Sequence, residues 1–215
     1  MKTVFKAVLV VVIAMIAVEA NAQNRFKLGY VGANMKAKGT GATTTYSQSG
    51  FLVGFDHDLA LPTVSGLSVR PGVNFVYATG KMSGDKLTEM DVYVPIDVKY
   101  AYEIDNALGV YAFAGPRFDV GLSSKISGGD ESYKYSGDYY TGKYETTYEG
   151  QTTTEEGEGS FNRFDLKFGL GAGVKYNNLS FEVGYDLGLL NRYREASDGY
   201  SLKRNRFVLT VGYSF

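Results

Sequence analysis

The chain has 215 residues and a formal net charge of −1, with 27 glycines, 18 tyrosines, 13 phenylalanines and no cysteine. This length suits one domain of ordinary size. The balanced charge gives no electrostatic basis for binding nucleic acid, and the lack of cysteine excludes a disulfide framework and a thiolate zinc site.

The first 22 residues have the features of a secretory signal peptide. Lys2 and Lys6 form a basic start, and residues 7–18 are an unbroken apolar run. Small residues at both ends of segment 20–22, the two positions that a signal peptidase reads, predict cleavage before Gln23. An uncleaved anchor is the weaker interpretation, because a membrane-spanning helix needs about 20 apolar residues. Removing residues 1–22 takes away two lysines and one glutamate, so the net charge of the mature chain, 23–215, changes from −1 to −2.

The rest of the chain alternates apolar and polar residues with a period of two, which indicates β-strands. Strand 163–176, for example, has phenylalanine and leucine on one face and arginine, aspartate, lysine and glycine on the other. Without a long apolar helix, a membrane-embedded version of this chain must be a closed barrel. The eight expected strands cover 26–36, 49–61, 67–77, 89–103, 108–122, 163–176, 179–189 and 206–215.

The connections between these strands alternate in length. Short turns are expected around Pro62, Asn106 and Asn178, and longer connections between the other strands, the longest being 123–160. Short turns at one rim and long loops at the other are typical of outer-membrane barrels, in which the short side is periplasmic. We therefore predict an all-β fold, an eight-stranded antiparallel up-and-down transmembrane barrel with 123–160 as a long extracellular loop.

A soluble lipocalin-like barrel would show the same alternation with its apolar face inward. The polar face is rich in glycine, which weakens a water-exposed strand but fits a narrow lumen crowded by long charged side chains. Acidic and basic residues are balanced on that face, as expected for buried charges that must be paired. We therefore predict a charge network in the lumen, formed by Arg70, Asp91, Asp97, Lys99, Arg117, Asp119, Arg163, Asp165, Lys167, Glu182, Asp186, Arg204 and Arg206.

The last strand ends in an alternating apolar pattern that resembles the C-terminal recognition signal of outer-membrane barrels. Such a signal implies the barrel-assembly machinery as a partner during insertion. With the signal peptide, it predicts the outer membrane of a Gram-negative cell, where the barrel would contact membrane lipid and lipopolysaccharide. The residues of this insertion signal are Phe207, Leu209, Val211, Tyr213 and Phe215.

Stretches 67–77, 90–100 and 110–118 resemble the outer-membrane β-barrel domain of the PorT-like, or porin family, proteins. The resemblance covers nearly all of the mature chain and implies an outer-membrane location and a small barrel, but no single activity. Members of this family carry prolines at similar places in these strands. A closed barrel offers no free edge to a proline, so we expect locally broken ladders at Pro71, Pro95 and Pro116.

The sequence predicts no catalytic, cofactor or metal site. His57 is the sole histidine and shares the lipid-facing phase near the periplasmic rim. A serine and a carboxylate in register would be needed for a lipid-modifying enzyme, and no serine stands out. One histidine without cysteine is a poor basis for a transition-metal site. The glycines of 169–173 lie mid-strand with no following helix, so they are not a nucleotide-binding loop.

The long loop 123–160 is rich in tyrosine and acidic residues. Tyrosine offers a large, stiff contact surface that suits carbohydrates or a partner protein, extracellular or periplasmic. The alternative is a hydrophilic surface loop, or a hairpin that continues the flanking strands above the membrane. The candidate binding surface consists of Tyr133, Tyr135, Tyr139, Tyr140, Tyr144 and Tyr148.

These features favour a non-enzymatic outer-membrane scaffold whose external loops bind a partner or form surface structure. A narrow porin-like channel is the alternative that the family label suggests. Eight strands, however, leave an interior that side chains fill. We therefore expect no pore for large solutes.

Overall fold

The structure is a computed structural model that describes residues 22–130, 132–196 and 199–215. The predicted signal peptide lies outside the described residues, apart from Ala22. No helix in the described part of the chain is long and apolar enough to span a membrane. The strands are β1 (Ala22–Gly39), β2 (Ala42–Ala60), β3 (Leu67–Met82), β4 (Asp85–Glu103), β5 (Leu108–Gly129), β6 (Tyr133–Asp138), β7 (Lys143–Tyr148), β8 (Gln151–Glu156), β9 (Phe164–Tyr176), β10 (Leu179–Gly188) and β11 (Ser201–Ser214).

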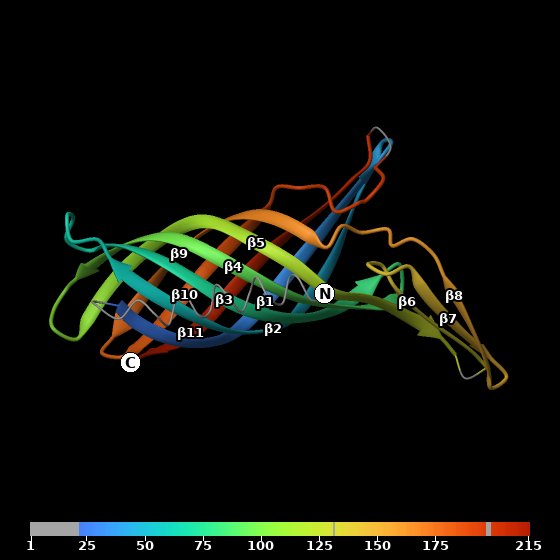
Figure 1. The fold of residues 1–215 in the computed structure, drawn as a ribbon, viewed down its shortest axis with the longest axis horizontal. Coiled ribbons are helices and arrows are strands. Elements are labelled where there is room, and N and C mark those ends of the chain that lie inside the picture. The colour runs from blue at the N-terminus through green and yellow to red at the C-terminus, as the bar shows by residue number, and fades with distance from the viewer. Residues whose placement is uncertain (1–21, 131, 197–198) are drawn as a thin grey trace.

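Eight of these strands close into an antiparallel ring (Figure 1). Their order is β1-β2-β3-β4-β5-β9-β10-β11, and β11 pairs with β1 to complete the circle. The ring confirms the predicted eight-stranded up-and-down barrel. Its lower end, at the left of Figure 1, carries the C-terminus and short turns. The upper end carries β6, β7 and β8, which pair in sequence beyond the upper part of β5 and extend the same sheet away from the ring. We call β6–β8 the tongue.

Several strands extend further upward than the sequence predicted. The longer connections expected after the first and third strands are in fact two-residue turns, Thr40–Gly41 and Ser83–Gly84. Ser83 and Gly84 have φ values of 55° and 98°, which are typical of the type I′ turn that fits the twist of a hairpin. Most residues that were expected to form these two connections therefore belong to the strands.

Apolar side chains of the lower barrel point away from the ring. Phe164, Phe181 and Leu209 are 49%, 55% and 45% exposed, whereas Glu182 and Arg206 are 8% and 1% exposed. A soluble barrel would show the reverse. The arrangement is that of a transmembrane barrel, whose outer wall faces hydrocarbon.

The upper barrel has the opposite polarity. On β1 the inward residues change from Arg25 and Lys27 below to Val31 and Met35 above, and the outward residues turn from apolar to polar after Tyr30. The other strands that reach this height also bury apolar residues, and the charged side chains of Glu89, Arg192 and Arg204 are buried there as well. The inward residues at that height include Ala33, Leu52, Val76, Ala78, Leu87, Ile126 and Leu202.

Aromatic residues mark the upper edge of the outward apolar belt. Tyr30 pairs with Phe51 across β1 and β2, and Phe51 pairs with Tyr77 across β2 and β3. The rings of Phe51 and Tyr77 stack with centroids 5.5 Å apart. Such aromatic girdles lie at the membrane–water interface of transmembrane barrels, so this row locates the outer surface of the membrane.

Backbone pairing is interrupted beside the three prolines. Paired residues are missing between β3 and β4 next to Pro71 and Pro95, and between β4 and β5 next to Pro116, but the register resumes unchanged after each gap. The predicted broken ladders are therefore present without a change of register. The register shift between β4 and β5 lies at Met90/Asp91 instead, where Leu122 is the extra residue.

Candidate functional sites: the ionic core and the tongue

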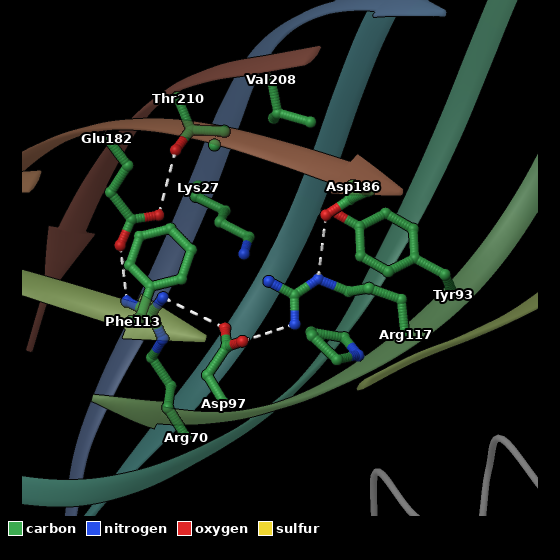
Figure 2. Close-up of a pocket in the computed structure, with 12 residues that line it drawn as sticks. Lys27, Arg70, Tyr93, Asp97, Phe113, Arg117, Glu182, Asp186, Val208 and Thr210 are labelled. Atoms are coloured by element: carbon green, nitrogen blue, oxygen red, sulfur yellow. Dashed lines mark hydrogen bonds and ion pairs between the residues drawn. The ribbon is translucent and has the colours of Figure 1, made fainter. Parts of the chain in front are cut away.

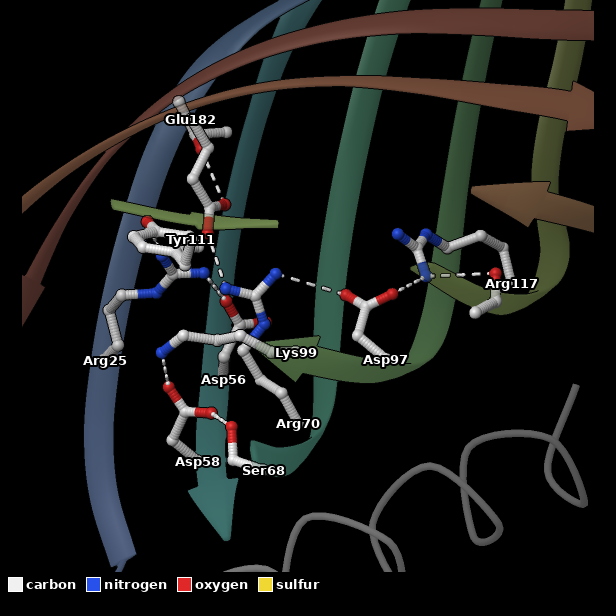
Figure 3. A network of polar contacts seen from close by, with 12 residues as sticks. Arg25, Asp56, Asp58, Ser68, Arg70, Asp97, Lys99, Tyr111, Arg117 and Glu182 are labelled. Atoms are coloured by element: carbon white, nitrogen blue, oxygen red, sulfur yellow. Dashed lines mark hydrogen bonds and ion pairs between the residues drawn. The ribbon is translucent and has the colours of Figure 1, made fainter. Parts of the chain in front are cut away.

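Inside the lower barrel, Glu182 on β10 joins two arginines from distant strands. Arg25 on β1 and Arg70 on β3 both donate to Glu182 Oε1 (Figure 3). Arg25 also pairs with Asp56, whose second partner is Lys27, with 2.9 Å between Nζ and a carboxylate oxygen. All five side chains are buried, so each charge depends on its partners rather than on water for stabilisation.

The network continues across the barrel from Arg70. Its guanidinium lies 3.2 Å from Asp97, which also accepts from Arg117. Arg117 Nε donates to Asp186 at 3.2 Å (Figure 2). Arg206 Nε donates to the other oxygen of Asp186 at 2.9 Å. These contacts tie β3, β4, β5, β10 and β11 together through their inner faces.

The far end of the network is a second set of shared carboxylates. Arg206 lies 3.5 Å from Asp119, which also pairs with Lys167, and Lys167 lies 2.8 Å from Asp165. The result is a continuous series of alternating charges with equal numbers of each sign. We call these residues the ionic core: Arg25, Lys27, Asp56, Arg70, Asp97, Arg117, Asp119, Asp165, Lys167, Glu182, Asp186 and Arg206.

Aromatic rings and small residues fill the space between these charges. Tyr93 lies under the Arg206 guanidinium at 3.9 Å, and Phe113 under that of Arg70 at 4.4 Å. Gly171 provides the room for Phe113, because a Cβ there would lie 2.4 Å from the ring. A cavity of about 30 Å³ remains beside Arg70 and Arg117, about the volume of one water molecule.

Above the ionic core, the barrel mouth is closed by residues from the strands and the loops. Tyr140, at the base of the tongue, is buried inside the mouth, where Gly121 leaves room for its hydroxyl. Arg192, from the connection between β10 and β11, donates to Tyr140 Oη at 2.6 Å and to Glu89 at 2.7 Å. Burial raises the pKa of Tyr140, so its phenol stays protonated at neutral pH. The cap of the barrel comprises Met35, Leu87, Ile126, Tyr140, Phe161 and Leu202.

The predicted lumen residues occupy different places in this arrangement. Arg204 pairs with Asp91 near the cap, and Lys99 pairs with Asp58 at the lower mouth. Arg163 lies outside the ionic core: it precedes β9, is half-buried, and donates to the backbone oxygens of Gly121 and Leu122. The remaining predicted residues belong to the ionic core: Arg70, Asp97, Arg117, Asp119, Asp165, Lys167, Glu182, Asp186 and Arg206.

Besides Asp56, which the alternation of strand 49–61 places on the polar face, four buried charged residues were missed from the sequence. Arg25 and Lys27 alternate with Phe26 and Leu28, so the period-two pattern contained their signal. Glu89 lies at the start of a predicted strand, and Arg192 lies in a loop with no periodicity. Charge alone could not place Arg192 in the barrel mouth.

The predicted tyrosine surface divides into two groups. Tyr139 and Tyr140 belong to the barrel mouth rather than to an exposed surface, since Tyr140 is 4% exposed and Tyr139 stacks on Phe161 with ring centroids 4.5 Å apart. Burial raises the pKa of Tyr139 to about 12. The other four lie on one face of the tongue: Tyr133, Tyr135, Tyr144 and Tyr148.

Strand register places these four tyrosines together. Tyr133 pairs directly with Tyr148, and Gly137 pairs with Tyr144, so all four share the parity of the face that continues the inner wall of β5. Gly137 lets the Tyr144 ring lie flat on the sheet, because a Cβ at Gly137 would lie 2.3 Å from it. Tyr133, Tyr144 and Tyr148 are 43%, 38% and 58% exposed. We call Tyr133, Tyr135, Tyr144 and Tyr148 the tyrosine face.

Of the remaining sequence candidates, the C-terminal strand lies on the outer wall, whereas His57 is 3% exposed and is therefore buried, not open to lipid as its phase predicted. His57 Nδ1 lies 2.7 Å from Asn24 Oδ1, within hydrogen-bond distance. Alternate residues of the C-terminal strand point outward and are between 37% and 65% exposed, and the Phe215 amide donates to Asn24 O at 2.9 Å. These outward residues are Phe207, Leu209, Val211, Tyr213 and Phe215.

Comparison with known proteins finds one matching family model, whereas the sequence identity to individual solved structures is low. Residues 20–193 match the model of the family described as outer membrane protein beta-barrel domain. A comparison with curated proteins finds no match.

Among solved structures, the attachment invasion locus protein Ail of Yersinia pestis is 13% identical, with 91% of this chain and 100% of that chain covered and a TM-score of 0.40. Neisserial surface protein A is 12% identical over 88% of this chain and 97% of that chain, with a TM-score of 0.43. The outer membrane enzyme PagL is 11% identical over 86% of this chain and 98% of that chain, with a TM-score of 0.45.

Proposed function

Because the chain belongs to the outer membrane protein beta-barrel domain family and lies in the outer membrane of a Gram-negative cell, we propose that it is a non-enzymatic binding protein. The barrel is a closed scaffold, and the tongue presents the tyrosine face to an external partner, a carbohydrate or a protein. The observation that carries this proposal is the gathering of four tyrosines on one face of an otherwise hydrophilic sheet. Rigid aromatic side chains give large contact areas at a low cost in conformational entropy.

The ionic core supports the scaffold role. Its charges are paired, and the space beside them is about that of one water molecule. At the level of the ionic core, the interior therefore stiffens the barrel under the tongue rather than holding a ligand. The non-enzymatic assignment is supported by the burial of the sole histidine, His57, which is 3% exposed.

Deleting the β7–β8 hairpin tests the binding role without opening the barrel. Gly157 N donates to Gly142 O at 2.9 Å, so removal of 143–156 joins two residues that are already in contact. The shortened protein keeps Tyr139 and Tyr140 and should insert normally. In glycan-array and surface pull-down measurements it should lose the partners that the intact protein captures.

A double substitution in the tyrosine face should have the same effect on binding. We expect Tyr133→Ser with Tyr148→Ser to weaken partner binding at least tenfold, because each exposed ring contributes contact area at a cross-strand position. The matched control is Thr147→Ala with Thr152→Ala, a hydrogen-bonded pair on the opposite face of the tongue. Equal binding by the tyrosine variant and this control would contradict the proposal.

Within the family, we place the chain beside the PorT-like, or porin family, barrels on the basis of stretches 67–77, 90–100 and 110–118. The alternative function that this label suggests is a narrow channel. We expect planar-bilayer recordings of the purified barrel to show no stable large unitary conductance, because side chains fill its interior. Stable conductance that persists after removal of 143–156 would favour the channel instead.

A further inference from the structure

A band of lysines lies on the outer wall of the barrel just above the aromatic row Tyr30, Phe51 and Tyr77. All of these lysines are exposed and lie on outward positions of β1, β3, β4, β5 and β11. They form no ion pair with any residue in the described part of the chain. We call this band the lysine collar: Lys36, Lys38, Lys81, Lys86, Lys125 and Lys203.

Four of these lysines face one another in two like-charged pairs. Lys36 on β1 is directly opposite Lys203 on β11, and Lys81 on β3 is directly opposite Lys86 on β4. Directly opposed residues have Cβ atoms about 4.5–5.5 Å apart, at which like charges are destabilising. The two lysines of each pair therefore repel each other. An external anion bound between them would relieve that repulsion.

The described β2 residues between the two pairs are neutral. Between them, β2 contributes Thr45, which pairs with Lys36, and Ser47, whose hydroxyl donates to Asn34. The Thr45 hydroxyl can donate to a phosphate oxygen, whereas the single proton of the Ser47 hydroxyl is used in its bond to Asn34. Acidic groups face the collar at Lys125, which pairs with Asp138 and is near Glu145. The two lysine pairs themselves have no carboxylate opposite them in the described strands.

The height of the collar indicates which anion it meets. Lys81 is four residues above Tyr77 on β3, and Lys203 is four residues before Phe207 on β11, about 13 Å along a strand at roughly 3.3 Å per residue. Since strands of such barrels tilt by about 35–45°, the ammonium groups lie roughly 10 Å above the apolar belt. This is the layer of lipid head groups on the same side of the membrane as the tongue.

We propose that the lysine collar binds the phosphorylated head groups of outer-leaflet glycolipid, of the lipid A type. The two lysine pairs and the Thr45 hydroxyl supply the contacts. The inference rests on the outer-membrane location of the barrel and does not depend on any partner of the tongue, so each can fail without the other. Basic side chains at a membrane surface attract anionic lipid in the same way.

The test compares the full-length barrel with a variant in which all four paired lysines become glutamine: K36Q, K81Q, K86Q and K203Q. Unfolding temperatures are measured in neutral detergent, with and without added bisphosphorylated lipid A. Lipid A should raise the unfolding temperature of the wild-type protein by several degrees and have little effect on the variant. Without lipid A, the variant should be at least as stable as wild type, because the repulsion between paired lysines is gone.

Three controls distinguish the outcomes. K134Q with K143Q removes lysines from the tongue and should leave the lipid A response unchanged. Dephosphorylated lipid A and inorganic phosphate should each fail to stabilise the wild-type protein. An equal lipid A response in wild type and the four-lysine variant would overturn the proposal. Equal stabilisation by inorganic phosphate would also overturn it, in favour of a free-anion site.

Discussion

Replacing Glu182 with glutamine should lower the free energy of unfolding by about 3–5 kcal/mol, the usual cost of removing one partner from a buried ion pair. Glutamine keeps the shape of the side chain but leaves Arg25 and Arg70 facing each other across a neutral amide. Urea titration of the folded barrel in lipid vesicles, followed by its electrophoretic mobility shift, measures this change.

The control for this substitution is Glu155→Gln, the same chemical change at an exposed position of β8. Surface substitutions of this kind usually change stability by less than about 0.5 kcal/mol. A Glu182→Gln barrel that unfolds at the wild-type urea concentration would show that the ionic core does not contribute to stability as its contacts indicate.

Phe168→Arg should reduce insertion of the barrel into vesicles and lower its stability by about 2–4 kcal/mol, the cost of arginine on the lipid face near mid-bilayer. Phe168 lies on the outer face of β9 and is 43% exposed. The inserted fraction is measured by protease protection and by the mobility shift of folded barrels.

The matched control is Thr45→Arg, which places the same charge on an outward position of β2 above the apolar belt. This variant should insert as well as wild type. If the Phe168→Arg variant inserts as well as wild type, the outer wall of the lower barrel does not face lipid, and the assignment of this chain as a transmembrane barrel is wrong.

The sequence predicted the barrel well where each strand keeps one polarity along its whole length. Strand 179–189 alternates cleanly, and β10 covers Leu179–Gly188. The predicted third strand instead stopped at Tyr77, although β3 continues to Met82. Beyond Tyr77 the apolar residues lie on the inner face of β3. A prediction that assigns one polarity to each face along the whole strand therefore ends the strand at Tyr77.

The candidate sites were less predictable because they depend on which strands become neighbours. Period two places Glu182 in the lumen, but it does not show that Arg25, 157 residues away in sequence, reaches the same carboxylate. Likewise, counting tyrosines in 123–160 could not separate Tyr140, which fills the barrel mouth, from Tyr148 on the tyrosine face. Deleting most of the predicted loop, for example 128–158, would remove Tyr140 from the cap, whereas removal of 143–156 leaves it in place.

The exchange of polarity halfway up the strands also fixes the vertical position of the barrel. If the barrel moved into the membrane by two residues along a strand, Asn34 and Lys36 would approach the hydrocarbon. If it moved outward by the same amount, Phe51 and Tyr77 would be exposed to water. A tilt or a vertical shift of the barrel can therefore relieve little of a mismatch between the height of the apolar belt and the thickness of the hydrocarbon core. The surrounding bilayer must adjust its thickness to the protein instead. Membranes of matched acyl length should give the highest folding yield, with a loss on either side.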